Sequence, residues 1–282
     1  MSGESPRATR GEPVHQQVAR NIRNQIAAGG LRHGQALPST RDLAEEWDVS
    51  VFTINEAMAT LISEGLVISK SRSGRFVNAP DQAFHAEIRP AAPNVFLIGG
   101  YAGSGKTELG RILARETGWP MLDKDTLTRP VVEAALEILG LSPNDRESET
   151  YLSMIRPREY EALANAWTEN VQCGSSAIVT APFIKEFKDA AWLNRVEASC
   201  ADMNAKLTVV WVYCDPATMR TYIRHRGAAR DTAKIENWSR YLDGIDIEFR
   251  PSVPHQVVDN SASGIPLQVQ ARDLVSLVAE NS

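Results

Sequence analysis

Residues 95–107 read VFLIGGYAGSGKT. The first five form an apolar run typical of a buried strand, and residues 100–107 match the phosphate-binding P-loop pattern G-x-x-x-x-G-K-[ST] at every fixed position. The following residues, Glu108 to Arg115, are good helix formers, so the order is strand, glycine-rich turn and helix, as the pattern requires. Glycines let successive backbone N–H groups point at phosphate oxygens, and the start of the helix adds partial positive charge. The stretch therefore predicts a site for a nucleoside triphosphate.

The residue types within this loop predict a role for each side chain. Lys106 is expected to reach the terminal phosphates, and the Thr107 hydroxyl is expected to ligate Mg²⁺. The residues expected to contact the nucleotide are Gly100, Ala102, Gly103, Ser104, Gly105, Lys106 and Thr107.

Strand-like and helix-like segments alternate after the P-loop. The expected strands are 121–123, 177–181, 207–213 and a weaker 257–259, and the expected helices are about 130–139, 149–173 and 266–279. Alternation of this type predicts an α/β fold in which a parallel sheet is flanked by helices. Ligands of such sheets bind at the carboxyl ends of the strands, so the candidate chemistry is expected there.

The N-terminal part shows a different pattern. Apolar residues at four-residue spacing indicate a helix over 14–28, and Ser39 and Asp42 have the S-x-x-D spacing of a capped helix start. Ser50 opens a third expected helix, and two short strands over 67–77 enclose a basic turn. The expected buried face of the third helix is Ile54, Met58, Leu61 and Ile62. Three helices and a basic hairpin predict a winged helix-turn-helix.

Several motifs of this part lie in a recognisable order. They are Leu-Pro-Ser-Thr-Arg-Asp-Leu-Ala (37–44), Val-Ser-x-x-Thr (49–53), Glu-Gly-Leu-Val (64–67) and Ser-Gly-Arg-Phe-Val (73–77). With these motifs, residues 13–78 strongly resemble the GntR family of bacterial transcription regulators. The resemblance implies that the helix from Ser50 enters the DNA major groove, that the wing at Lys70 to Arg75 lies against the minor groove or backbone, and that a homodimer reads two half-sites of a double-stranded operator. The residues expected to contact DNA are Thr40, Arg41, Ser50, Phe52, Thr53, Asn55, Lys70, Arg72 and Arg75.

The recognition helix departs from the family pattern. Members usually carry arginines after the serine and again before the Glu-Ala pair, where this chain has Val51 and Asn55. Arginine is the commonest reader of guanine, whereas asparagine pairs with adenine edges. The domain is therefore expected to read a different sequence or to bind more weakly, and the alternative is a winged helix that contacts protein.

The charge of the chain gives the N-terminal part no general attraction for DNA. Residues 1–90 contain ten Lys/Arg and ten Asp/Glu, so the net charge of −5 comes from the remaining residues. The positive charge is local, because no acidic residue lies between Lys70 and Arg75. DNA binding is therefore expected to be salt-sensitive, to involve few phosphates per half-site and to depend on dimerisation.

The C-terminal part carries an acidic pair after its second expected strand, Asp123-Lys124-Asp125. Together with the P-loop, residues 94–280 resemble the small P-loop kinases, a group that includes gluconate kinase, adenylylsulfate kinase, chloramphenicol phosphotransferase and the zeta toxins. In these kinases an acidic residue at this place binds or deprotonates the acceptor hydroxyl. The resemblance implies that Asp125 is an acceptor-facing base or an outer-sphere Mg²⁺ ligand, with Asp123 as its alternate. Either residue could instead be a helix N-cap.

Four arginines follow the fourth expected strand. Arg220, Arg224, Arg226 and Arg230 lie at spacings of four, two and four. In the kinases that this segment resembles, an arginine-bearing lid closes over ATP and neutralises charge on the transferred phosphoryl group. The resemblance implies that Arg224 and Arg230 contact phosphate, with Arg226 also at the nucleotide. The alternative is a solvated basic helix face.

Asp215 ends an apolar strand and superficially resembles the carboxylate of a Walker B strand. A proline follows it directly, which also makes it a good N-cap, and we favour this second interpretation. The strand expected over 177–181 ends in Thr180-Ala181-Pro182, without an acidic residue, so the sequence leaves the Mg²⁺ ligands beyond Thr107 open. Arg156 and Arg158 either line an acceptor pocket or lie on the surface.

Composition indicates two domains and no membrane span. With 282 residues and 43% hydrophobic content, the chain can fill two cores. Residues 79–93, rich in proline and alanine, are the expected linker between 13–78 and 94–282, and residues 1–12 are expected to be a flexible tail with no signal-peptide core. No apolar run approaches the roughly 18 residues that span a bilayer. Three scattered cysteines fit reduced thiols in a cytoplasm.

These observations favour a DNA-binding transcription regulator whose C-terminal P-loop domain binds ATP, alone or with a metabolite, and modulates operator binding. The alternative is a bifunctional small-molecule kinase that transfers the γ-phosphate of ATP to a hydroxyl acceptor and carries an attached DNA-binding module. A third hypothesis is a kinase whose N-terminal module serves docking or dimerisation. Acceptor-dependent release of ADP would favour the second hypothesis, and failure to bind DNA would favour the third.

Overall fold

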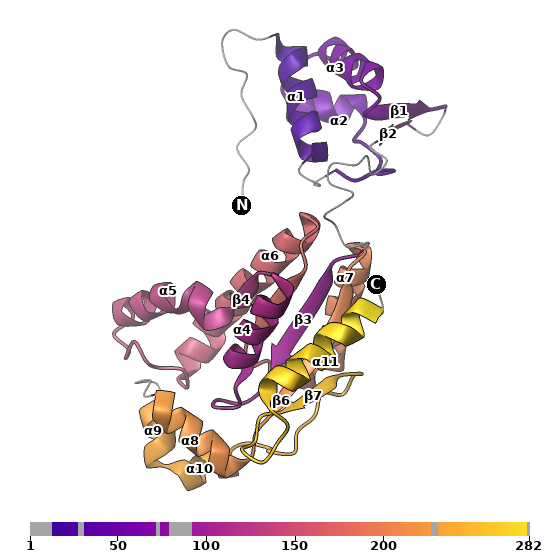
Figure 1. The fold of residues 1–282 in the computed structure, drawn as a ribbon. Helices are drawn as coiled ribbons and strands as arrows, with labels where there is room; N and C mark the ends of the chain where they lie inside the picture. The colour runs from indigo at the N-terminus through magenta and orange to yellow at the C-terminus, as the bar shows by residue number, and fades with distance from the viewer. Residues whose placement is uncertain (1–12, 28–30, 72–73, 79–91, 227–230, 281–282) are drawn as a thin grey trace. The chain divides into compact units, whose positions relative to one another are not determined.

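A computed structural model describes residues 13–27, 31–71, 74–78, 92–226 and 231–280. The chain divides into two compact units, Met1–Ile88 and Arg89–Ser282, which are described separately (Figure 1). The expected tail 1–12 lies outside the described residues, as does the expected linker 79–93 apart from its last two residues.

The N-terminal unit is a winged helix-turn-helix, as the sequence predicts. Its elements are the helices α1 (Val14–Ala27), α2 (Thr40–Glu46) and α3 (Val51–Ser63) and the strands β1 (Val67–Lys70) and β2 (Gly74–Val77). The two strands pair antiparallel with Val67 opposite Val77. Ile54, Met58 and Leu61 form the buried face of α3, but Ile62 is 40% exposed, so its predicted burial is wrong. Ile62 lies four residues after Met58 but about 100° around the helix from Leu61, which places it at the edge of the apolar stripe.

Side-chain caps fix the starts of α2 and α3. The Asp42 N–H donates to Ser39 Oγ at 3.2 Å, and the Ser39 N–H donates to Asp42 Oδ2 at 3.1 Å. This reciprocal pair is a capping box, which satisfies two backbone donors that the helix itself leaves unpaired. At α3 the Thr53 N–H donates to Ser50 Oγ at 3.1 Å. Both caps confirm the helix starts predicted from the sequence.

We expect Ser39→Ala to lower the local stability of α2 by about 1 kcal/mol, because alanine cannot accept the N3 backbone hydrogen bond. Hydrogen-exchange mass spectrometry of the full chain measures this as faster exchange in peptides that cover α2. Glu46→Ala, an exposed change on the same helix, is the control and is expected to stay within about 0.5 kcal/mol. Equal exchange in the two variants would contradict a stabilising role for the capping box.

The C-terminal unit is built on one parallel sheet. Its strands are β3 (Asn94–Gly99), β4 (Met121–Asp123), β5 (Ala177–Thr180), β6 (Lys206–Tyr213) and β7 (Gln256–Asp259), in the order β4-β5-β3-β6-β7. Every adjacent pair in this sheet is parallel. All six residues of the central strand β3 are buried. A parallel strand covered on both faces needs such a continuous apolar run, which is what the sequence shows before the P-loop.

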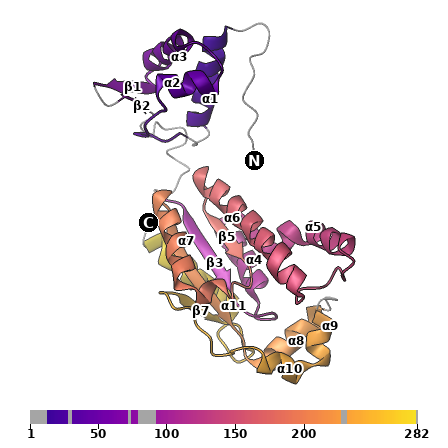
Figure 2. The same cartoon turned by 180° about the vertical axis from the view of Figure 1, so that it is seen from behind.

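Helices cover both faces of this sheet. The covering helices are α4 (Lys106–Thr117), α6 (Arg156–Gln172), α7 (Ala190–Asp202) and α11 (Leu267–Glu280). α5 (Lys124–Ile138) packs against α6, and α8 (Pro216–Arg226), α9 (Thr232–Glu236) and α10 (Trp238–Asp243) form a group beyond the strand ends (Figure 1). Successive strand residues point to opposite faces. Phe96 and Ile98 therefore share a core with residues of α4 and α11, and Leu97 shares the opposite core with residues of α6 and α7. α4 and α11 lie in front of the sheet in Figure 1, and α6 and α7 lie in front of it in Figure 2.

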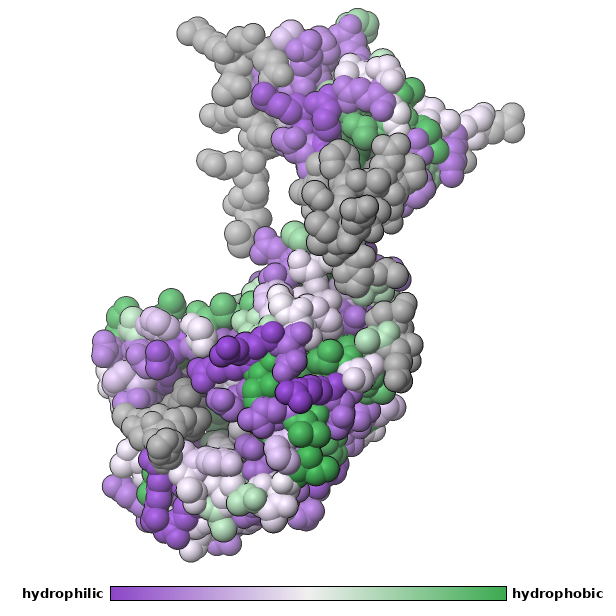
Figure 3. Space-filling view, in the orientation of Figure 1, coloured by the Kyte–Doolittle hydropathy of each residue, from purple (hydrophilic) through white to green (hydrophobic). Residues whose placement is uncertain are grey.

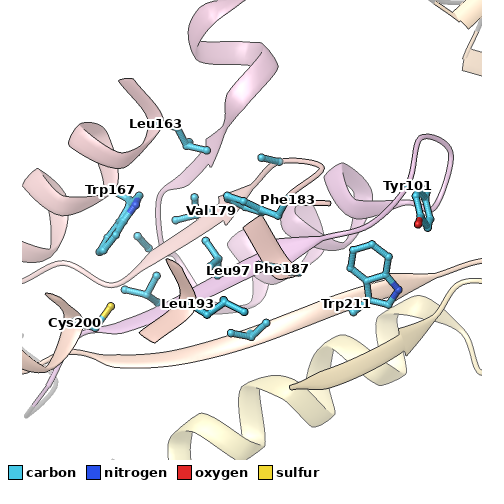
Figure 4. Close-up of a cluster of buried hydrophobic side chains, with 14 of the residues drawn as sticks. Leu97, Tyr101, Leu163, Trp167, Val179, Phe183, Phe187, Leu193, Cys200 and Trp211 are labelled. Carbon is cyan, nitrogen blue, oxygen red and sulfur yellow. The ribbon is translucent and has the colours of Figure 1, made fainter. Parts of the chain in front are cut away.

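The larger core lies between the sheet and the pair α6 and α7. Figure 4 shows Leu163 and Trp167 from α6, and Leu193 and Cys200 from α7, gathered around Leu97 of β3. Aromatic rings extend this cluster toward the P-loop, where Phe183 stacks on Phe187 at 5.3 Å between ring centroids and Tyr101 meets Trp211 edge to face at 5.5 Å. Each large apolar side chain buried here contributes about 1.5–3 kcal/mol to folding. The core therefore anchors the strand ends that carry the candidate site.

Some predicted helix boundaries are wrong. The helix expected from about 130 begins instead at Lys124, because Asp123 caps it: the Thr126 N–H donates to Asp123 Oδ1 at 3.0 Å. Pro130 therefore lies inside α5, at the cost of one helical hydrogen bond. The helix expected over 149–173 is divided into a π-helical turn (Tyr151–Ile155) and α6. The predicted strands and closing helix are confirmed to within one or two residues, while α7 was not predicted.

The visible surface is largely hydrophilic, with apolar side chains gathered near α5 and α11 (Figure 3). Ile138 and Val131 on α5 are 85% and 73% exposed, and Val269 on α11 is 43% exposed. Among the described residues, no helix combines the length and apolar character needed to cross a membrane.

Candidate functional site

The P-loop occupies the turn between β3 and α4, and its glycines are required by the space and the backbone. Gly103 and Gly105 have φ of 81° and 96°, a region that side chains disfavour. A Cβ on Gly105 would lie 2.1 Å from Asn260 Nδ2, and one on Gly103 would lie 2.6 Å from Ile223 Cγ1. Asn260 Nδ2 also donates to the Ser104 carbonyl at 3.0 Å. The loop is thus held from outside by the residue that follows β7, a contact that the sequence did not indicate.

The polar groups of the loop suit a phosphate ligand. Lys106 Nζ donates to the Tyr101 carbonyl at 2.8 Å, which holds the lysine over its own loop. Ser104 Oγ is buried and has no hydrogen-bond partner within the described part of the chain. The Gly100 N–H, by contrast, donates to the Pro182 carbonyl at 3.1 Å and joins the P-loop to the segment after β5. Gly100 therefore anchors the loop, while the buried Ser104 hydroxyl and the Lys106 ammonium are groups that phosphate oxygens would satisfy.

Asp123 joins the P-loop to two neighbouring elements. Its Oδ2 accepts from the Thr180 hydroxyl at 2.7 Å and from the Thr107 hydroxyl at 3.3 Å, while its Oδ1 caps α5. The N-cap interpretation of Asp123 is thus confirmed, and the same carboxylate lies beside the P-loop threonine. Carboxylate and hydroxyl oxygens are ligands that Mg²⁺ accepts directly or through water. Thr107 and Asp123 therefore fit the ion, and Thr180 positions the carboxylate.

Asp125 makes a different set of contacts from Asp123. Its Oδ1 is 3.0 Å from Lys124 Nζ, and that buried ammonium is also 2.7 Å from Glu159 Oε1. The Tyr151 hydroxyl donates to Glu159 Oε2 at 2.5 Å, and Thr128 Oγ1 donates to Oε1 at 3.0 Å. Burial and the bond to Glu159 raise the pKa of Tyr151 well above its usual value, so this hydroxyl stays protonated as a donor. The network fixes the start of α5 against α6 and was not foreseen from the sequence.

The arginines of the expected lid are only partly described. Arg224 on α8 is exposed, which matches the solvated-face alternative for this residue. Arg220 lies 5.8 Å from the Trp238 ring, and its Nε is buried with no hydrogen-bond partner among the described residues. The Arg226 side chain and all of Arg230 lie outside the described residues. Among the described arginines of α8, Arg220 is therefore the one whose guanidinium lies against another side chain, the Trp238 ring, whereas Arg224 faces solvent.

Asp215 is a helix cap. Its Oδ1 accepts from the Ala217 and Thr218 N–H groups, both at 2.9 Å, and α8 begins at Pro216. Hydrogen bonds from the Thr218 side chain and backbone lower the pKa of Asp215, as a cap carboxylate requires. The favoured interpretation is confirmed.

The two arginines before β5 have separate roles. Arg156 pairs with Glu186 at 2.8 Å, with its guanidinium 4.2 Å from the Tyr160 ring. Arg158 pairs with Glu161 on the exposed side of α6. Arg156 is thus held in a part-buried ion pair, and Arg158 is a surface residue.

We expect Asp123→Asn to weaken Mg²⁺-dependent nucleotide binding about tenfold, or about 1.4 kcal/mol, because it removes the negative charge beside Thr107. Asp215→Asn is the matched control, since asparagine caps a helix as well as aspartate and the expected change is less than about twofold. Calorimetric titration with a non-hydrolysable ATP analogue, with Mg²⁺ and then with EDTA, measures both. A larger loss of nucleotide affinity in Asp215→Asn than in Asp123→Asn would place the metal ion at the end of β6 instead.

The residues expected to contact DNA surround the start of α3. Ser50 caps the helix, Phe52 is 69% exposed on its first turn, and Asn55 is exposed one turn later. From the wing, Lys70 Nζ lies 4.7 Å from the Phe76 ring. Arg72 lies outside the described residues.

Three of the residues expected to contact DNA are joined to one another: Thr40, Asn55 and Arg75. Thr40 and Asn55 both accept hydrogen bonds from Arg75 of β2. Arg41 on α2 is exposed. The structure therefore brings one wing arginine together with both helices of the helix-turn-helix.

Two known families match separate parts of the chain. The family described as "Bacterial regulatory proteins, gntR family" matches residues 14–77, and the family described as "AAA domain" matches residues 95–246, more than half of the chain. The chain belongs to the AAA domain family. In front of this AAA domain it carries a GntR-type DNA-binding domain, and the AAA domain itself is a kinase-like P-loop domain.

Individual relatives match one domain or the other. The AAA domain is similar to the shikimate kinase of Moorella thermoacetica (strain ATCC 39073 / JCM 9320), with 33% identity over 106 residues, or 36% of this chain and 57% of that protein. The DNA-binding domain is similar to the HTH-type transcriptional repressor NagR of Bacillus subtilis (strain 168), with 34% identity over 68 residues, or 24% of this chain and 28% of that protein. The chain thus spans less than two thirds of either relative.

A solved structure is also similar to this chain. It is a putative kinase from Chloroflexus aurantiacus J-10-fl, 20% identical, which covers 66% of this chain and 98% of its own with a TM-score of 0.47.

Proposed function

We propose that this chain is a transcription regulator in which residues 13–78 bind a double-stranded operator and residues 94–282 bind ATP with Mg²⁺, the bound nucleotide changing the affinity for DNA. The observation that carries the proposal is the presence, in one polypeptide, of an exposed recognition helix and a P-loop whose Thr107 is joined to a carboxylate. An operator with two half-sites would be read by a homodimer.

The nucleotide side of the proposal rests on the groups around the P-loop. Ser104, Lys106 and the loop N–H groups would hold the phosphates, and Thr107 with Asp123 would hold the ion. Bound Mg²⁺ would neutralise phosphate charge. ATP can alter DNA affinity only if it binds one arrangement of the chain better than another. Since cellular ATP is abundant, a sensor of this type needs weak affinity or a second, competing ligand.

A second candidate function is a small-molecule kinase with an attached DNA-binding module. The favouring observation is that Asp123, the cap of α5, lies beside the P-loop threonine, with Asp125 in the first turn of the same helix. In this candidate Asp125 or Asp123 accepts the proton of an acceptor hydroxyl, and Arg224 and Arg230 neutralise the transferred phosphoryl group. ADP release that depends on an added acceptor would favour it.

The test is fluorescence anisotropy with labelled duplex DNA from upstream of the chain's own gene, with and without Mg²⁺ and ATP. The wild type is compared with Lys106→Ala, and Lys185→Ala serves as a control that removes an exposed lysine outside the P-loop pattern. We expect ATP to shift DNA affinity in the wild type and in Lys185→Ala, and to have no effect in Lys106→Ala.

Other outcomes point elsewhere. If DNA binds but ATP changes nothing, the regulator hypothesis loses its effector and an acceptor screen tests the kinase. If no DNA binds, the N-terminal domain is a docking or dimerisation module, and the proposal fails.

A further inference from the structure

The wing reaches the recognition helix through a single arginine. Arg75 of β2 donates from Nη1 to Thr40 Oγ1 at 2.8 Å and from Nη2 to Asn55 Oδ1 at 2.9 Å. The guanidinium thus joins the wing to the first residue of α2 and to the exposed face of α3. Its two partners lie 35 and 20 residues away along the chain.

This pair changes what Asn55 can offer to a base. A guanidinium carries five N–H donors and no acceptor, so the amide oxygen of Asn55 must face Arg75. The remaining polar group of the amide is an NH₂ with two donors. A further donor approaching the same oxygen would lie beside a full positive charge, whereas an acceptor would be attracted by both the amide and the guanidinium. The pair therefore presents donors only.

Within the described part of the chain, no carboxylate forms an ion pair with Arg75. Glu56, the carboxylate next to Asn55 in sequence, lies about 100° around α3 from Asn55, and its Oε2 is 3.6 Å from His15 Nδ1 of α1. Val51 lies four residues before Asn55, on the same helix face, and is 46% exposed. The face thus combines an apolar side chain with an all-donor polar pair.

Guanine and adenine differ in the hydrogen-bonding groups that they offer to such a donor pair. In the major groove guanine offers two adjacent acceptors, N7 and O6, whereas adenine offers one acceptor and one donor. We propose that the Asn55–Arg75 pair reads guanine, with Arg75 supplying from the wing the guanidinium that the recognition helix lacks at positions 51 and 55. Asn55 touches the base, and Arg75 acts as the positioning residue that excludes adenine. This inference rests on the proposed binding of DNA.

The test is in vitro selection of binding sites from a random-sequence duplex library, using the full chain. We expect the wild type to select guanine at one position of each half-site. Arg75→Ala frees the amide oxygen of Asn55 to accept, so we expect the selected base at that position to change to adenine. Asn55→Ala is expected to lose the base preference at that position without gaining one for adenine. Arg20→Ala, which removes an exposed positive charge from the same domain, is expected to select the wild-type site.

Duplexes that differ only at that base pair then give the size of the effect. We expect anisotropy titrations to show that the wild type prefers guanine over adenine by at least about fivefold and that Arg75→Ala reverses this preference. Circular dichroism establishes that each variant is folded, and the exposed Asn55→Ala tests the same position if Arg75→Ala is unfolded. An unchanged base preference in the folded variants overturns the inference alone. Failure of the wild type to select any sequence overturns the proposed DNA binding, and the inference with it.

Discussion

Glu159→Ala is expected to lower the free energy of unfolding of the C-terminal unit by about 3–5 kcal/mol, because it leaves a buried ammonium without its main partner. Lys124 and Glu159 are 4% and 2% exposed, and their charged atoms lie 2.7 Å apart. The substitution also removes the acceptor of the Tyr151 hydroxyl, whereas the Thr128 hydroxyl keeps the Lys124 carbonyl as an acceptor. Buried donors without acceptors add to the loss.

Urea unfolding followed by tryptophan fluorescence measures this, since five of the six tryptophans lie after residue 94. Glu161→Ala, on the same helix, breaks only the exposed pair with Arg158 and is expected to cost about 0.5 kcal/mol. The double variant Lys124→Met/Glu159→Leu removes both charges and is expected to recover most of the stability. A loss in Glu159→Ala no larger than that in Glu161→Ala would contradict the role of the network.

This network also marks the limit of what the sequence could predict. Glu159 stands among charged residues, so α6 suggests a solvated face, and its partner Lys124 is 35 residues away. One signal was available: Glu159 shares a four-residue spacing with the buried Leu163 and Trp167. Periodicity identifies the buried position, but only the packing of α5 on α6 supplies the cation that makes a carboxylate acceptable there.

Features set by neighbouring residues were predictable. The capping box at Ser39 and the cap at Asp215 follow from residues two or three positions apart, and the P-loop follows from backbone conformations that only glycine adopts easily. Contacts between distant segments were not. Thr180 holds the Asp123 carboxylate across 57 residues, and nothing in the sequence around either residue indicates the other.

The recognition helix shows the same limit. Asn55 alone suggests an adenine contact. A pattern confined to one helix cannot show that Arg75 of the wing donates a hydrogen bond to the amide oxygen of Asn55. The kind of base that is read therefore depends on a contact between elements.

Lys106→Ala is expected to lower ATP affinity at least about a hundredfold, or about 2.7 kcal/mol, because it removes a charged donor from the phosphates. The fold should be unaffected. The conformation of the loop is set by its glycines and by Asn260, and alanine is the best helix former at the first position of α4. Any loss is therefore a loss of binding rather than of structure.

Three variants separate the requirements for charge and for shape. Lys106→Arg keeps the positive charge but replaces a compact ammonium with a planar fork, so we expect it to restore little of the affinity. Lys185→Ala removes an exposed lysine and is expected to bind ATP as the wild type does. Calorimetric titration with ATP and Mg²⁺, together with thermal unfolding of each variant, gives affinity and stability side by side. Because the phosphates of a P-loop ligand must lie at this lysine, an unchanged affinity in folded Lys106→Ala would remove the loop from the nucleotide site altogether.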